Sequence, residues 1–157
     1  TSIQVPGFKE VYDSGLPKLE LTDGHSFKFS TLPGIVLLKL LAWDDRPEVR
    51  RDDVKDISDI LNHFFYMYDY KIWDIHHDLL QDENMNSTHV AARVMGREMR
   101  LIVGQNKMLW NRIASILNLN TEDPAKSNMA RIMRDYFDNT VEENVDLLNH
   151  MKTGFAE

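Results

Sequence analysis

The pattern of apolar residues divides the chain into a short first part with alternating positions and a long second part with helical spacing. From residue 35 to residue 43 every side chain except Lys39 is apolar, which is typical of a helix buried on all sides. Further along, apolar residues recur with the period of amphipathic helices. The pattern predicts helices at residues 33–43, 52–68, 72–80, 87–103, 109–117 and 129–148.

The first part of the chain alternates between apolar and polar side chains. Asp23-Gly24 is a strong signal for a tight hairpin turn within it. Strands followed only by helices indicate an α+β fold, here mostly α. We therefore expect short antiparallel strands at 1–31, followed by a bundle of five to six helices at 32–157. The three alternating runs that predict the strands are residues 8–12, 18–21 and 26–29.

The composition excludes several classes of protein. A formal net charge of −7 argues against binding to duplex DNA, because phosphate contacts rely on clustered lysine and arginine. The absence of cysteine excludes disulfides and thiolate metal sites and fits a reducing cytoplasm. No membrane span is expected, because the apolar run at 35–43 is too short and contains Lys39. The unpaired sheet edge at 8–29 favours pairing with a second copy as a homodimer.

Lys39 is the most informative residue, because an unpaired charge inside a buried helix is costly. Trp43 and Arg46 follow it on the same face of the helix. We expect the charged residues of this helix and the next to meet at one place, where they either bind a ligand or neutralise one another. The charged residues that open the next helix are Asp52, Asp53, Lys55, Asp56 and Asp59.

The segment 32–61 places a lysine on an apolar helix, then an arginine, then a Lys-Asp pair and a second acid. In this order it resembles the C-terminal part of the AbiEii-like nucleotidyltransferases, bacterial toxin-type members of the DNA polymerase β superfamily. The resemblance covers the first half of the chain, including the strands expected before residue 32. The residues that carry it are Lys39, Arg46, Lys55, Asp56 and Asp59.

The resemblance implies transfer of a nucleoside monophosphate from a nucleoside triphosphate to an acceptor, assisted by Mg²⁺ that carboxylates hold. In the family, two of these carboxylates come from an Asp-x-Asp after a Gly-Ser turn, and this chain contains no Asp-x-Asp. We therefore expect a C-terminal fragment or a natural truncation that supports nucleotide binding without catalysing transfer alone. The implied partners are an antitoxin and an RNA acceptor, and Glu20 is the implied third metal carboxylate.

Each implied role has a simpler alternative. Lys39 and Arg46 would bind the triphosphate, yet Lys39 could extend its amine to water and Arg46 could stabilise the end of its helix. Lys55 and Asp59 form an i,i+4 pair, which on an exposed helix contributes only about 0.2–0.5 kcal/mol. Asp56 is expected to hold Lys39 or Arg46 in place.

The histidines do not predict a metal site. His76 and His77 are adjacent on a helix, so they point about 100° apart and converge poorly on one ion. His76 also falls on an apolar stripe, where a core histidine is expected. The histidines without a partner at metal-ligand spacing are His25, His63, His89 and His150.

A function of another class also fits the helical pattern. The chain could be a stand-alone interaction module that binds a protein partner and catalyses nothing. Its docking surfaces would be the amphipathic faces of the helices predicted at 90–103 and 129–148.

Overall fold

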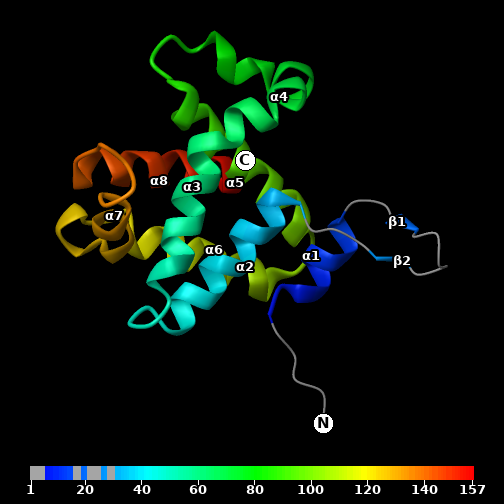
Figure 1. Cartoon of the computed structure of the whole chain (residues 1–157), viewed down its shortest axis with the longest axis horizontal. Helices are drawn as coiled ribbons and strands as arrows, with labels where there is room; N and C mark the ends of the chain where they lie inside the picture. Colours follow the sequence, from blue (N-terminus) through cyan, green and yellow to red (C-terminus); the bar gives the residue numbers. More distant parts are fainter. Residues whose placement is uncertain (1–5, 16–18, 21–25, 28–30) are drawn as a thin grey trace.

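The structure of the chain is a computed structural model that describes residues 6–15, 19–20, 26–27 and 31–157. Figure 1 shows the helices gathered in one bundle, with α4 at one end and with α1 and α7 on opposite sides. None of the described helices combines the length and the apolar composition that a membrane span requires. The described helices are α1 (Phe8–Ser14), α2 (Leu32–Asp45), α3 (Arg51–Met67), α4 (Asp69–Ile75), α5 (Ser87–Val103), α6 (Lys107–Leu119), α7 (Asn128–Met133), α8 (Val141–Ala156) and two 3-10 helices, η1 (His77–Gln81) and η2 (Pro124–Lys126).

The prediction of an α+β fold is wrong, because the described chain is helical in every element of its core. Residues 8–12, predicted as a strand, belong to α1. Their apolar residues Phe8, Val11 and Tyr12 fit positions i, i+3 and i+4 of a helix equally well, and so short a run cannot separate the two periods. The tertiary structure selects the helix, because Val11 is then buried where α1 packs on α2.

One short strand pairing remains in the described residues. Strand β1 (Leu19–Glu20) pairs antiparallel with β2 (Ser26–Phe27), with Leu19 opposite Phe27. The predicted turn residues Asp23 and Gly24 lie outside the described residues. Two residues per strand do not form a layer, so the nucleotidyltransferase-type sheet expected at 1–31 is absent from the described residues. The sheet edge that favoured a homodimer is absent there too.

Helix α2 is largely buried by other helices, as its sequence predicts, but the face that carries Ile35, Leu38, Lys39 and Ala42 is only partly buried. At its start, the Thr31 hydroxyl accepts a hydrogen bond from the Gly34 N–H at 3.3 Å, and Pro33 occupies the first turn. Side chains on different faces of the helix, such as Val36 and Leu37, are fully buried. Helices α1, α3, α5 and α6 provide the surrounding contacts. The predicted helical bundle is confirmed.

The final helix predicted at 129–148 is in fact two helices. Helix α7 ends at Met133, and α8 starts at Val141 after a capping box. In this box the Glu143 N–H donates to the Thr140 hydroxyl at 3.1 Å, and the Thr140 N–H donates to the Glu143 carboxylate at 2.8 Å. Periodicity did not reveal the break, because apolar residues keep helical spacing on both sides of it.

Helices α5 and α8 touch through their backbones. A Cβ atom added to Gly96 on α5 would lie 2.1 Å from the carbonyl oxygen of Met151. A Cβ atom added to Gly154 on α8 would lie 2.1 Å from the carbonyl oxygen of Arg93. Only glycine fits at either position, so the two glycines set the distance between these helices.

We predict that Gly96→Ala destabilises the protein, although alanine is normally the better helix former. The clash is with backbone, which cannot rotate away, so the expected loss is at least the ~1–3 kcal/mol of overpacking. The free energy of unfolding, measured by urea denaturation, tests this expectation.

Gly34→Ala is the matched control. Its new Cβ atom would meet the Cγ1 atom of Val11 at 2.8 Å, and this side chain belongs to the peripheral helix α1. We expect a smaller loss than for Gly96→Ala. Equal losses for the two variants would contradict the proposed role of the α5–α8 backbone contact.

Candidate functional site

The amine of Lys39 on α2 lies between two carboxylates of α3. It donates a hydrogen bond to the Asp56 carboxylate at 2.6 Å and one to the Asp53 carboxylate at 3.2 Å. The Lys39 side chain is 25% exposed, so the amine sits at the rim of the helix pair and not deep inside it. Charged residues of the two helices therefore meet here.

Asp53 is the most buried member of this cluster, with a side chain only 8% exposed. One of its carboxylate oxygens accepts from Lys39, and the other accepts from the Arg50 Nε–H at 2.7 Å. A buried carboxylate is costly unless it is paired on both oxygens. The two cations supply that pairing.

The protonation state of Lys39 follows from the same contacts. Burial alone would lower the pKa of its amine, but the hydrogen bonds to Asp56 and Asp53 raise the pKa above the usual value of 10.5. Lys39 is therefore a cation at every physiological pH.

A pocket of about 620 Å³ opens beside the cluster. One wall is apolar and is formed by α2 and by Pro6 and Phe8 at the start of α1. The other wall is charged and contains cations from three different helical regions. A pocket with these two walls can bind a molecule that has one apolar end and one anionic end. The charged residues of the lining are Lys39, Asp45, Arg50, Asp53 and Arg112.

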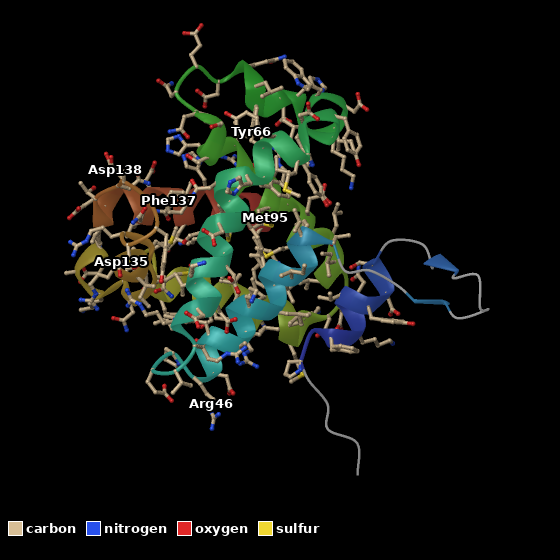
Figure 2. All side chains as sticks on the ribbon, viewed as in Figure 1. Arg46, Tyr66, Met95, Asp135, Phe137 and Asp138 are labelled. Atoms are coloured by element: carbon tan, nitrogen blue, oxygen red, sulfur yellow. The ribbon has the colours of Figure 1, made fainter. Side chains whose placement is uncertain are left out.

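Arg46, a predicted nucleotide contact, occupies the C-terminal cap of α2 and does not line this pocket. Figure 2 shows its side chain at the edge of the molecule, pointing away from the helices. Lys55 lies 3.0 Å from Asp59 on the exposed face of α3. Glu20 lies in β1 opposite Ser26, and its side chain is outside the described residues. The functional roles of these residues stay predictions.

Sequence reasoning assigned no role to three residues of the site, although it named Asp53 among the charged residues expected to meet. Asp53 has a usable signal, because it lies three residues before Asp56 and shares its helix face. Arg50 stands just before the predicted helix, where its side-chain direction could not be foreseen. Arg112 has no signal at all, since it comes from α6 and reaches the pocket only through tertiary packing.

His76 is a buried core residue, as predicted, with only 4% of the residue exposed. Its Nε2 atom lies 3.0 Å from the carboxylate of Glu98 on α5. This hydrogen bond is the main reason that the pKa of Glu98 is lowered. Burial acts in the opposite direction and raises it. Its other ring nitrogen, Nδ1, lies 3.3 Å from Arg97, which also pairs with Asp78 and Glu157.

The prediction that His89 and His150 lack metal-ligand partners is wrong. The two imidazole rings stack with their centroids 4.6 Å apart, and both Nε2 atoms face the same carboxylate oxygen of Asp146. Sequence spacing could relate only Asp146 to His150, one turn apart on α8. His89 comes from α5, so only the helix packing brings it to the pair.

Comparisons with protein-family models, with curated proteins and with solved structures found no match for this chain. What the molecule does is therefore inferred from its own geometry and from the sequence resemblance.

We predict that Asp53→Asn lowers the free energy of unfolding by about 1–3 kcal/mol, because Lys39 and Arg50 lose a buried charged partner. Asp59→Asn on the same helix is the matched control. It removes a carboxylate that is 49% exposed from a pair worth about 0.2–0.5 kcal/mol. Urea denaturation at neutral pH measures both variants, and similar losses would contradict the burial argument.

We also predict a pH dependence from Lys39. Because its pKa is raised in the folded state, its stabilising contribution is complete below pH 10.5 and is lost as the pH rises through the folded pKa. The difference in unfolding free energy between the parent and Lys39→Met should therefore be constant near neutrality and shrink above that pH. A difference that stays constant into strong alkali would show that the charge of Lys39 does not stabilise the fold.

Proposed function

We propose that this chain is the helical, substrate-binding portion of a nucleotidyltransferase, and that the pocket beside Lys39 binds a nucleoside triphosphate. One observation carries the proposal. An ammonium group has three N–H donors, and in the part of the chain that the structure describes Lys39 uses two of them, on Asp53 and Asp56. The third donor is left for a ligand at the partly exposed rim.

The neighbouring arginines support the same ligand. Arg50 donates its Nε–H to Asp53, and its half-exposed guanidinium has no other side-chain partner among the described residues, so it is available to the pocket. Arg112 belongs to α6, and among the described residues its polar contacts are long, 3.5 Å to the Leu41 carbonyl and 3.8 Å to Asp44. A planar guanidinium is well suited to phosphate oxygens, and the apolar wall formed by α2 suits a nucleobase.

In this proposal the two aspartates position Lys39 and are not ligands of a metal ion. Both oxygens of Asp53 and one oxygen of Asp56 already accept hydrogen bonds from cations. Mg²⁺ requires oxygen ligands in near-octahedral geometry, and these carboxylates do not fit that need. We therefore propose that Mg²⁺ arrives with the triphosphate, and we assign no catalytic step to this chain, which lacks the Asp-x-Asp of the family it resembles.

The resemblance to AbiEii-like nucleotidyltransferases supports the proposal at two positions. Lys39 and Asp56 are motif residues in that resemblance, and in the fold they lie in direct contact. The surfaces suggested for the alternative, an interaction module, are not available to a partner. The apolar faces at 90–103 and 129–148 include Val94, Met99 and Leu148, which are fully buried in the core.

We predict that the chain binds nucleoside triphosphates with Mg²⁺ and that Lys39→Ala and Arg50→Ala each weaken binding by about 10- to 100-fold. That range corresponds to the loss of one charge-assisted hydrogen bond, about 1.5–3 kcal/mol. Isothermal titration calorimetry with ATP, GTP, CTP and UTP provides the measurement.

Lys126→Ala is the matched control, because this lysine lies on η2 with a side chain that is 81% exposed. It should bind like the parent. Arg46→Ala tests the remaining predicted contact in the same series. If Lys39→Ala, shown to be folded by circular dichroism, binds as tightly as the parent, the proposed site is wrong.

A further inference from the structure

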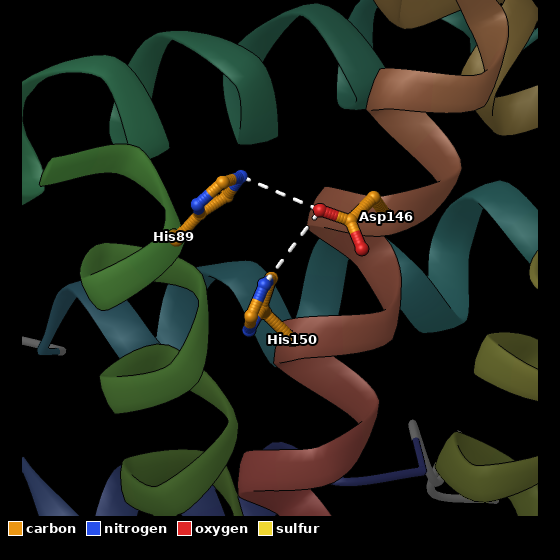
Figure 3. Close-up of side chains that lie close together, drawn as sticks. All are labelled: His89, Asp146 and His150. Carbon is orange, nitrogen blue, oxygen red and sulfur yellow. Dashed lines mark ion pairs between the residues drawn. The ribbon is translucent and has the colours of Figure 1, made fainter. Parts of the chain in front are cut away.

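A second cluster of chemically active side chains lies away from the Lys39 pocket, where α5 meets α8. Figure 3 shows His89 on α5 and His150 on α8, both directed at one carboxylate oxygen of Asp146. The two Nε2 atoms lie 3.4 Å and 3.7 Å from that oxygen. All three potential ligand atoms lie within 4.8 Å of one another.

These distances fit a tetrahedral metal ion. With zinc–ligand bonds of about 2.0–2.1 Å, two ligands of a tetrahedral site lie roughly 3.4 Å apart. The His89–Asp146 separation already has this value, and the His150–Asp146 separation of 3.7 Å is close to it. Two imidazoles and one carboxylate are donors that zinc accepts.

The backbone holds the three ligands in place without the metal. Asp146 and His150 lie one turn apart on α8, so their side chains share a face. Gly96 lies seven residues after His89 on α5, and Gly154 lies four residues after His150 on α8. The two helices touch at these glycines. The ligands therefore come from the most closely packed pair of helices in the described chain.

His89 must change its tautomer. Its Nδ1 atom accepts a hydrogen bond from the Asn86 N–H at 3.3 Å, which places the ring proton on Nε2, facing Asp146. A metal on Nε2 moves the proton to Nδ1 and removes this long capping hydrogen bond. The bond from the His89 N–H to the Asn86 side chain, at 2.9 Å, still caps α5.

We propose that His89, Asp146 and His150 form a site for Zn²⁺ or a divalent ion of similar ligand preference, such as Co²⁺. His89 and Asp146 also line a pocket of about 390 Å³. The fourth position of the ion is therefore open to water or to an external ligand, as in zinc sites with three protein ligands. The proposal is independent of nucleotide binding, because it shares no residue with the Lys39 pocket.

Isothermal titration calorimetry of the full chain with ZnCl₂ tests the proposal, after treatment with a chelator. We expect one bound zinc ion per chain and a rise in Tm, because the ion binds only the folded state. Asp146→Asn and His150→Gln should each weaken zinc binding by at least about 100-fold, the upper range for loss of an outer-shell partner. Mg²⁺, which prefers oxygen ligands, should neither bind nor compete.

His77→Gln is the matched control, because this histidine is exposed on η1 and outside the cluster. It should keep the affinity of the parent. A second readout is independent of affinity: ¹⁵N NMR of the imidazoles should show the His89 proton moving from Nε2 to Nδ1 on zinc addition. Absence of zinc binding by the parent, or unchanged affinity in folded Asp146→Asn, would overturn the proposal.

Discussion

The fold depends on a backbone contact between α5 and α8, which Gly96 and Gly154 make possible. Helix α5 in turn contacts α2, α3 and α6, and α8 contacts α6 and α7. A side chain at either glycine would push the helices apart by a distance that the densely packed core cannot absorb. The same contact places His89 beside Asp146 and His150, so the proposed metal site is a consequence of how the core packs.

The Lys39 cluster illustrates a second constraint, the cost of a charge next to a core. Asp53 is buried and needs both of its cations, whereas Lys39 lies at the rim and donates to two acceptors in the part of the chain that the structure describes. Neutralisation and ligand binding were the two alternatives for these charges. The geometry allows both at once, because the pairing holds the lysine in place without using all of its hydrogen-bonding capacity.

The predictions from sequence were wrong where a short apolar pattern is compatible with two different secondary structures. Residues 8–12 fit a strand and a helix equally well, and burial of Val11 against α2 decides for the helix. The break before α8 depends on a capping box at Thr140 and Glu143, a local signal that continuous apolar spacing outweighed. Among the site residues, Lys39 and Asp56 were predicted together, but Arg112 was not, since nothing local connects α6 to α2.

The sequence by itself determined the largely buried helix at 33–43, the helical nature of the chain after residue 32, and the meeting of Lys39 with acids of the next helix. These follow from local periodicity and from the cost of an unpaired charge. Only the tertiary structure decided which helices touch, and with that the all-helical fold, the pocket walls and the His89–Asp146–His150 cluster. The physical reason is that contacts between distant segments depend on how whole helix surfaces fit together, and no short stretch of sequence encodes that fit.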